Sequence, residues 1–113
     1  MKYRELESLE HLEETLALSQ DKPVIVLKHS TRCPISSEAL KQFEAYLADA
    51  PNENAEYALV KVIEARPVSN AIAEELNVEH QSPQAILIKG RESRWTASHW
   101  SITKAKLHEA LSQ

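Results

Sequence analysis

Residues 24–34, VIVLKHSTRCP, combine the pattern of a buried strand with that of a helix start, and they include the only cysteine of the chain. Val24 to Leu27 form a short β-branched apolar run between turn signals, which is typical of a strand covered on both faces. A polar segment follows, and Pro34 then suits the first position of a helix, where its missing backbone N–H costs nothing. The stretch therefore predicts a central parallel strand, a loop, and a helix whose N-cap is Cys33.

The segments on either side alternate between helical and strand patterns. Helices are predicted over Ser8 to Leu18, over Pro34 to Ala48, from Pro67 onwards, and after the N-cap candidate Thr103. Further strands are predicted over Tyr57 to Ile63, Ala85 to Ile88 and Ser93 to Thr96. The expected order αβαβαββα fits a thioredoxin-like α/β fold, in which helices flank a central mixed sheet of about four strands. A ferredoxin-like domain mixes similar elements and stays open as an alternative.

The composition excludes several classes of protein. Apolar residues make up 42% and charged residues 27% of the 113 residues, which suits one hydrophobic core, so we expect residues 1–113 to form a single domain. No apolar run is long enough to cross a bilayer and no apolar signal segment opens the sequence, which predicts a cytoplasmic protein without membrane contact. A net charge of −4 without clustered Lys and Arg argues against nucleic-acid binding.

The rare residue types limit the chemistry. One cysteine forms neither an internal disulfide nor a multi-thiolate zinc site, and the five histidines are scattered, so no metal is predicted. One glycine leaves no room for a glycine-rich nucleotide loop, so no cofactor is predicted and electrons must arrive as thiols.

Cys33 itself has two interpretations. An unpaired cysteine is commonly a small core residue. At a helix N-terminus, however, unpaired backbone N–H groups and the helix dipole stabilise a thiolate and lower the thiol pKa. Arg32 adds a cation beside it, and Ser36, one helical turn on, is placed to donate its hydroxyl proton to the sulfur. These neighbours favour a reactive thiol.

Pro83 directly precedes a strand-like run, where a proline weakens a central strand unless it takes a special conformation. A cis peptide after Ser82 would supply one, although most X–Pro bonds in folded proteins are trans. The thioredoxin-like fold places a cis-proline loop against the N-terminus of the active-site helix. Combined with Cys33, this proline predicts a cis Ser82-Pro83 peptide beside the thiol.

Three segments resemble the YtxJ-type monothiol bacilliredoxins, and the resemblance covers nearly the whole chain. They are Thr31 to Ser36 (TRCPIS), the Ser82-Pro83 step, and Trp95 to Trp100 (WTASHW). The resemblance implies a monothiol thiol-disulfide oxidoreductase that removes bacillithiol, its thiol co-substrate, from mixed disulfides with proteins. It puts Cys33 in the place of the nucleophile and Ser36 where dithiol relatives have a resolving cysteine. A second thiol or a partner protein must therefore regenerate the enzyme.

Around the thiol we expect a small set of site residues. The catalytic candidates are Cys33, Ser36 and Arg32, and the substrate-binding candidates are Thr31, Pro34, Ser82, Pro83, Trp95 and His99. Several of these types have plainer interpretations. Trp95 and Trp100 would more often pack the last helix onto the sheet. His29 is either a proton relay or a surface loop residue. Lys28 and Arg32 either meet the carboxylates of bacillithiol or are solvated loop charges.

Two alternatives to a bacilliredoxin remain open on the sequence. One is a non-catalytic thioredoxin-like module that holds an extended peptide beside Ser82-Pro83, with Cys33 incidental. The other is an iron–sulfur carrier of the monothiol glutaredoxin type, whose Cys-Gly-Phe-Ser motif is missing here. Bacillithiol is favoured over glutathione because Trp95 to Trp100 holds no glycine where glutaredoxin-like proteins have a glycine-rich turn. Its aromatic and hydroxyl groups suit a glucosamine–malate ligand.

Overall fold

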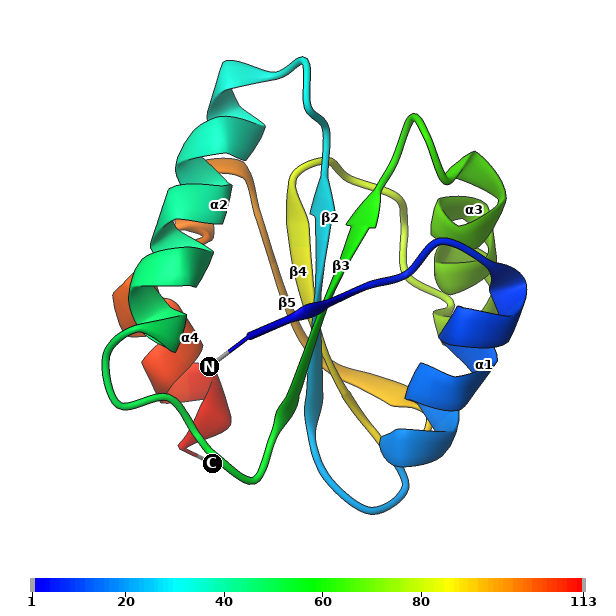
Figure 1. Ribbon diagram of the computed structural model, residues 1–113, viewed down its shortest axis with the longest axis horizontal. Coiled ribbons are helices and arrows are strands. Elements are labelled where there is room, and N and C mark those ends of the chain that lie inside the picture. Colours follow the sequence, from blue (N-terminus) through cyan, green and yellow to red (C-terminus); the bar gives the residue numbers. More distant parts are fainter. Residues whose placement is uncertain (1, 113) are drawn as a thin grey trace.

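The computed structural model describes residues 2–112 and contains a five-stranded mixed sheet with helices on both faces (Figure 1). The strands are β1 (Arg4–Glu5), β2 (Val24–His29), β3 (Glu56–Lys61), β4 (Gln84–Lys89) and β5 (Glu92–Ser98). The helices are α1 (Leu9–Leu18), α2 (Pro34–Leu47), α3 (Arg66–Leu76) and α4 (Lys104–Leu111), with a 3-10 turn η1 (His99–Ser101) before α4.

The strands lie in the order β1-β3-β2-β4-β5. β2 pairs in parallel with β3 and antiparallel with β4, so the strand predicted to be central is central. Helices α2 and α4 cover one face of the sheet, and α1 and α3 cover the other (Figure 1). The predicted thioredoxin-like α/β arrangement is confirmed, with one strand more than the four expected.

The added strand β1 is only two residues long and lies at the edge of the sheet, beside β3. Its residues Arg4 and Glu5 are charged and show no apolar alternation, which is why a search for strand patterns misses it. β5 extends beyond the predicted Thr96 to Ser98, because its ladder with β4 continues to the Gln84↔Ser98 pair. Trp95 to Ser98 are therefore strand, and only His99–Ser101 form the turn expected there. β3 ends at Lys61, before the predicted Ile63, because its pairing with β2 ends at the His29↔Lys61 pair.

The core consists of two clusters, one on each face of the sheet. β2 is buried along its whole length and contributes to both, because successive side chains of a strand point to opposite faces. Ile25 and Leu27 pack under α2 and α4, whereas Val24 and Val26 pack under α1 and α3. This double burial explains the unbroken apolar run in the sequence.

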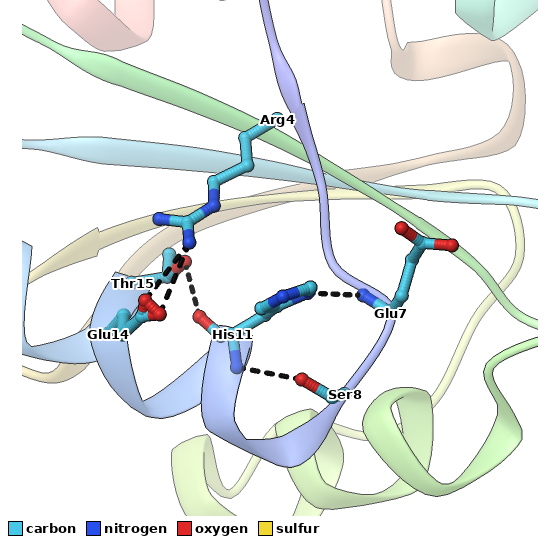
Figure 2. A network of polar contacts seen from close by, with 6 residues as sticks. All are labelled: Arg4, Glu7, Ser8, His11, Glu14 and Thr15. Atoms are coloured by element: carbon cyan, nitrogen blue, oxygen red, sulfur yellow. Dashed lines mark hydrogen bonds and ion pairs between the residues drawn. The ribbon is translucent and has the colours of Figure 1, made fainter.

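Polar contacts fix the start of α1 against β1 (Figure 2). The Ser8 hydroxyl accepts a hydrogen bond from the His11 backbone N–H at 3.1 Å, as predicted for an N-cap. The His11 ring Nδ1 in turn accepts from the Glu7 backbone N–H at 3.1 Å. An exposed ion pair joins Arg4 Nη2 to a Glu14 carboxylate oxygen at 3.0 Å and contributes little to stability on its own. Thr103 likewise caps α4 by accepting from the Lys106 N–H at 3.2 Å.

The packing of α2 yields a first prediction. Phe43 is fully buried, and its ring lies between those of Tyr3 and Tyr57, at centroid distances of 5.6 and 6.3 Å. We expect Phe43→Ala to lower the free energy of unfolding by about 3–5 kcal/mol, because it leaves a cavity under the helix that carries Cys33. Urea unfolding followed by circular dichroism measures this. The control Lys41→Ala, at an exposed position of the same helix, should change the free energy of unfolding by less than about 0.5 kcal/mol. A Phe43→Ala loss as small as that of the control would contradict the packing.

Candidate active site

Cys33 lies at the N-cap of α2 with extended backbone angles (φ −111°, ψ 123°), and Pro34 follows in the first turn. The side chain is partly exposed, so a reagent can reach the sulfur. The backbone N–H of Ser36 is the largest factor that lowers the pKa of Cys33, with help from the Ile35 N–H and the Ser36 hydroxyl and against partial desolvation. The predicted thiolate-stabilising helix start is therefore present, but the expected contribution of Arg32 is not among the causes that lower this pKa.

Ser36 also organises the loop that leads to the thiol. It is fully buried, and its hydroxyl oxygen accepts a hydrogen bond from the Ser30 backbone N–H at 3.3 Å. The Ser30 carbonyl in turn accepts from the Cys33 N–H at 3.4 Å. One side chain thus links the helix, the loop and the sulfur. Arg32 and Thr31 are exposed, and the Thr31 hydroxyl donates to Glu64 Oε2 at 3.3 Å.

The Ser82-Pro83 peptide is cis, as predicted. Pro83 directly precedes Gln84, which pairs with Lys28 near the carboxyl end of β2. The cis-proline loop and the loop to Cys33 therefore lie at the same end of the sheet (Figure 1). The Ser82 hydroxyl is buried and has no hydrogen-bond partner among the described residues.

A groove of about 340 Å³ begins at Pro34, the residue after the thiol. It is lined from α2 by Pro34, Glu38, Ala39 and Gln42, and from the opposite side by His99, Trp100, Ile102 and Thr103. Trp100 is 68% exposed, so its indole is available to a ligand. The groove combines an aromatic ring with a carboxylate, an amide and a hydroxyl. A larger hollow of about 430 Å³ lies near the far end of α2, beside Tyr3 and Glu44, away from the thiol.

The turn that carries Trp100 is tied to the cis-proline loop. The His99 backbone has φ +53°, in the left-handed region that non-glycine residues seldom adopt. Its N–H donates to the Pro83 carbonyl at 3.0 Å. Trp95, by contrast, is half-buried and packs against the core cluster under α2 and α4. The packing interpretation therefore holds for Trp95 but is wrong for Trp100.

Two residues of the predicted loop belong to the sheet instead. β2 continues its ladder with β3 to the His29↔Lys61 pair, so Lys28 and His29 are buried strand residues. The expectation that Lys28 meets ligand carboxylates is wrong, because its ammonium lies inside the protein, 3.0 Å from His80 Nδ1. His29 is not a surface loop residue either. Burial is the main cause that lowers its pKa, and its Nδ1 has no partner within residues 2–112.

Sequence reasoning missed the polar lining of the groove and the partner of Lys28. Pro34, Glu38 and Gln42 recur every four residues, which places them along one side of a helix, so this signal was available. His80 lies in a loop without periodicity, and nothing in the sequence connects it with Lys28. No cluster of His, Cys, Asp or Glu among the described residues could hold a metal ion. Within the same residues, every helix is too short or too polar to span a membrane.

Comparisons with known proteins agree with this geometry. The family model described as monothiol bacilliredoxin BrxC matches residues 4–107. A solved structure reported as a candidate oxidoreductase with a thioredoxin fold is 33% identical to the chain, with a TM-score of 0.83 over 96% of this chain and 92% of that one. Two thioredoxins share the fold. The one from Fasciola hepatica is 20% identical, with a TM-score of 0.74 over 96% of both chains. The one from Malassezia sympodialis is 20% identical, with a TM-score of 0.77 over 99% of this chain and 90% of that one.

The origin of the thiol's acidity gives a second prediction. Ser36→Ala removes the hydroxyl but keeps the backbone N–H that is the main cause of the low Cys33 pKa. We expect the pH midpoint of iodoacetamide alkylation to lie below the free-thiol value of about 8.5 in the wild type and to move upward, without reaching that value, in Ser36→Ala. The exposed neighbour Ser37→Ala serves as the control and should match the wild type. A wild-type midpoint at or above the free-thiol value would refute the assignment of a stabilised thiolate.

Proposed function

The chain belongs to the monothiol bacilliredoxin BrxC family and is a thiol-disulfide oxidoreductase, and we propose that it uses Cys33 to remove bacillithiol from mixed disulfides with proteins. Family membership implies bacillithiol-linked protein substrates. The observation that carries the proposal is the partly exposed thiol of lowered pKa, which lies next to the groove and at the same end of the sheet as the cis-proline loop. We further infer that residues 1–113 act as one domain, in the cytoplasm, where a low-molecular-weight thiol supplies the electrons.

The proposed reaction has two exchange steps. The Cys33 thiolate attacks the bacillithiol sulfur, the disulfide to the target breaks, and the electron pair leaves on the target sulfur, which takes up a proton. The protein then carries a Cys33–bacillithiol disulfide. Because the chain has only one cysteine, an external thiol must attack this disulfide and release the Cys33 thiolate. Each step exchanges one disulfide for another, so no cofactor is consumed.

The proposed roles of the neighbouring residues follow from their positions. Ser36 stabilises the thiolate and shapes its loop. The backbone of Ser82-Pro83 is suited to pair with an extended segment of the target protein, as in strand addition. The exposed Arg32 is placed to meet a carboxylate of the malate group, and the exposed Thr31 lines the approach to the sulfur.

The groove suits the rest of bacillithiol. The exposed indole of Trp100 offers a face for the glucosamine ring. The Thr103 hydroxyl accepts from the Lys106 N–H, and the Gln42 amide bonds to Lys104 and Glu38, which leaves the Thr103 O–H and one Gln42 N–H to donate to the ligand's hydroxyl groups. The carboxylate of Glu38 complements the α-ammonium of the cysteinyl part, which lies close to the reacting sulfur. His99, at the start of η1, forms the wall nearest the cis-proline loop. Trp95 supports the site by packing against the core cluster under α2 and α4, and does not offer its ring face to the ligand.

The enzymatic assignment is tested with one target protein carrying either bacillithiol or glutathione. We expect the wild type to release bacillithiol at least about tenfold faster, since a difference of about 1.4 kcal/mol in transition-state binding gives a factor of ten. Cys33→Ser should be inactive on both, because a hydroxyl does not replace a thiolate nucleophile. Mass spectrometry of the products measures both. Equal rates of release from the two substrates would refute the proposed specificity for bacillithiol. Residual turnover by Cys33→Ser would refute the mechanism, whereas a wild type without turnover on either substrate would favour a non-catalytic binding module.

The groove is tested by Trp100→Ala, with Leu9→Ala as the control. Leu9 is 56% exposed but lies on α1, at the opposite face of the sheet. Loss of an aromatic contact of about 1 kcal/mol should raise KM for the bacillithiolated protein roughly fivefold in Trp100→Ala. The rate of Cys33 alkylation should not change. If KM is the same in both variants, the groove does not hold the low-molecular-weight thiol.

A further inference from the structure

Lys28 is an unusual residue for the interior of the sheet. Its side chain is 0% exposed, and its Nζ lies 3.0 Å from Nδ1 of His80, in the loop between α3 and β4. Lysine is almost never fully buried unless an acidic group pairs with it. In the described part of the chain, no hydrogen bond or ion pair connects Lys28 with a carboxylate. The ammonium donates instead to a neutral imidazole.

This arrangement costs the fold stability. Burial lowers the pKa of Lys28 to about 8, so the side chain is still charged at neutral pH although it is removed from water. Burial, Lys28 and Arg66 together hold the pKa of His80 below its ordinary value, and no acidic group counteracts them. A well-packed apolar side chain would stabilise the same position. Residues that persist at a cost in stability are characteristic of functional sites.

Lys28 and Gln84 together hold the segment before the cis-proline. The two residues lie directly opposite each other in the β2–β4 ladder. The buried Gln84 side chain donates from Nε2 to the Glu79 carbonyl at 3.1 Å and accepts at Oε1 from the Gln81 N–H at 3.4 Å. With the Lys28–His80 bond, residues 79–81 are thus attached to the sheet at three consecutive positions. The next two residues are Ser82 and Pro83.

Lys28 does not act directly on the Cys33 thiol, because the two side chains belong to opposite faces of the sheet. Because alternate side chains of a strand share a face, Lys28 points to the same face of the sheet as Val24 and Val26, toward α1 and α3. Cys33 begins α2, which lies on the other face. The causes that set the Cys33 pKa are the Ser36 and Ile35 backbone, the Ser36 hydroxyl and desolvation, with no contribution from Lys28.

We propose that Lys28 and His80 are positioning residues for the protein substrate: their hydrogen bond holds residues 79–83 in the conformation in which the Ser82-Pro83 backbone receives the target chain. A charged donor in a dry setting gives a stronger bond than a neutral pair. A loop that is already ordered loses less entropy when the substrate binds. The inference rests on the proposed function, because the loop is assigned there to the target protein.

The test compares Lys28→Met and His80→Ala with the exposed control Lys106→Met, using the bacillithiolated target protein. We expect KM to rise roughly five- to tenfold in Lys28→Met and His80→Ala, because the loop must then be ordered during binding. The value of kcat and the pH profile of Cys33 alkylation should stay unchanged. The double variant should raise KM no further, since both changes remove one bond. Backbone amides of residues 79–82 and of Gln84 should exchange hydrogen faster in both single variants.

Stability separates this role from a purely structural one. The pKa of Lys28 is about 8 in the folded protein against 10.5 ordinarily, so the unfolded chain binds more protons between these values. Wild-type stability therefore rises with pH across this window. Lys28→Met lacks the effect and should be more stable than the wild type at pH 7, with an advantage that shrinks toward pH 10.5. A structural lysine would give the reverse order at pH 7.

The outcomes are distinct. Unchanged KM and unchanged amide exchange in Lys28→Met overturn the positioning role, and so does a Lys28→Met protein less stable than the wild type at pH 7. A wild type that releases no bacillithiol refutes the proposed function instead. In that case amide exchange and stability still report on the Lys28–His80 bond.

Discussion

The enclosure of β2 on both faces is the constraint on which the other elements depend. A strand with no solvent-facing side needs helices above and below, and here α2 and α4 meet Ile25 and Leu27 while α1 and α3 meet Val24 and Val26. The carboxyl end of that strand is therefore held firmly, and the short loop after it delivers Cys33 to a fixed helix start. Antiparallel pairing with β4 brings the cis-proline to the same end. The site is thus a consequence of how the central strand is covered.

Much of the fold was predictable because its signals are local. The apolar run of β2, Pro34 at a helix start, and the caps Ser8 and Thr103 each depend on residues within one turn of the chain. The strand β1 was not predictable, since two charged residues become a strand only through pairing with β3, more than fifty positions away. The full length of β5 was missed for the same reason, because the ladder with β4 and not the local pattern decides where the strand ends.

The site was predictable where chemistry and local structure coincide, as at Cys33, Ser36 and the Ser82-Pro83 peptide. It was not predictable where burial overrides polarity. Lys28 and His29 were assigned to a loop because they are polar, yet the β2 ladder carries both inside the protein. The place of Trp100 at the groove was also missed, because exposure of a tryptophan depends on how η1 projects from the sheet. Sequence patterns indicate which residues favour water, but tertiary packing decides which of them reach it.

The way the thiolate is stabilised has a consequence for how the protein responds to ionic strength. The groups that lower the pKa of Cys33 are backbone N–H groups and a buried hydroxyl, which are fixed dipoles in direct contact and are barely screened by dissolved ions. Charges on the surface, such as the exposed Arg32, are screened strongly at physiological salt. The reactivity of the sulfur and the attraction of an anionic partner therefore depend on different physics. A rise in ionic strength therefore screens the exposed charge of Arg32 while the fixed dipoles at the sulfur keep their effect on the pKa of Cys33.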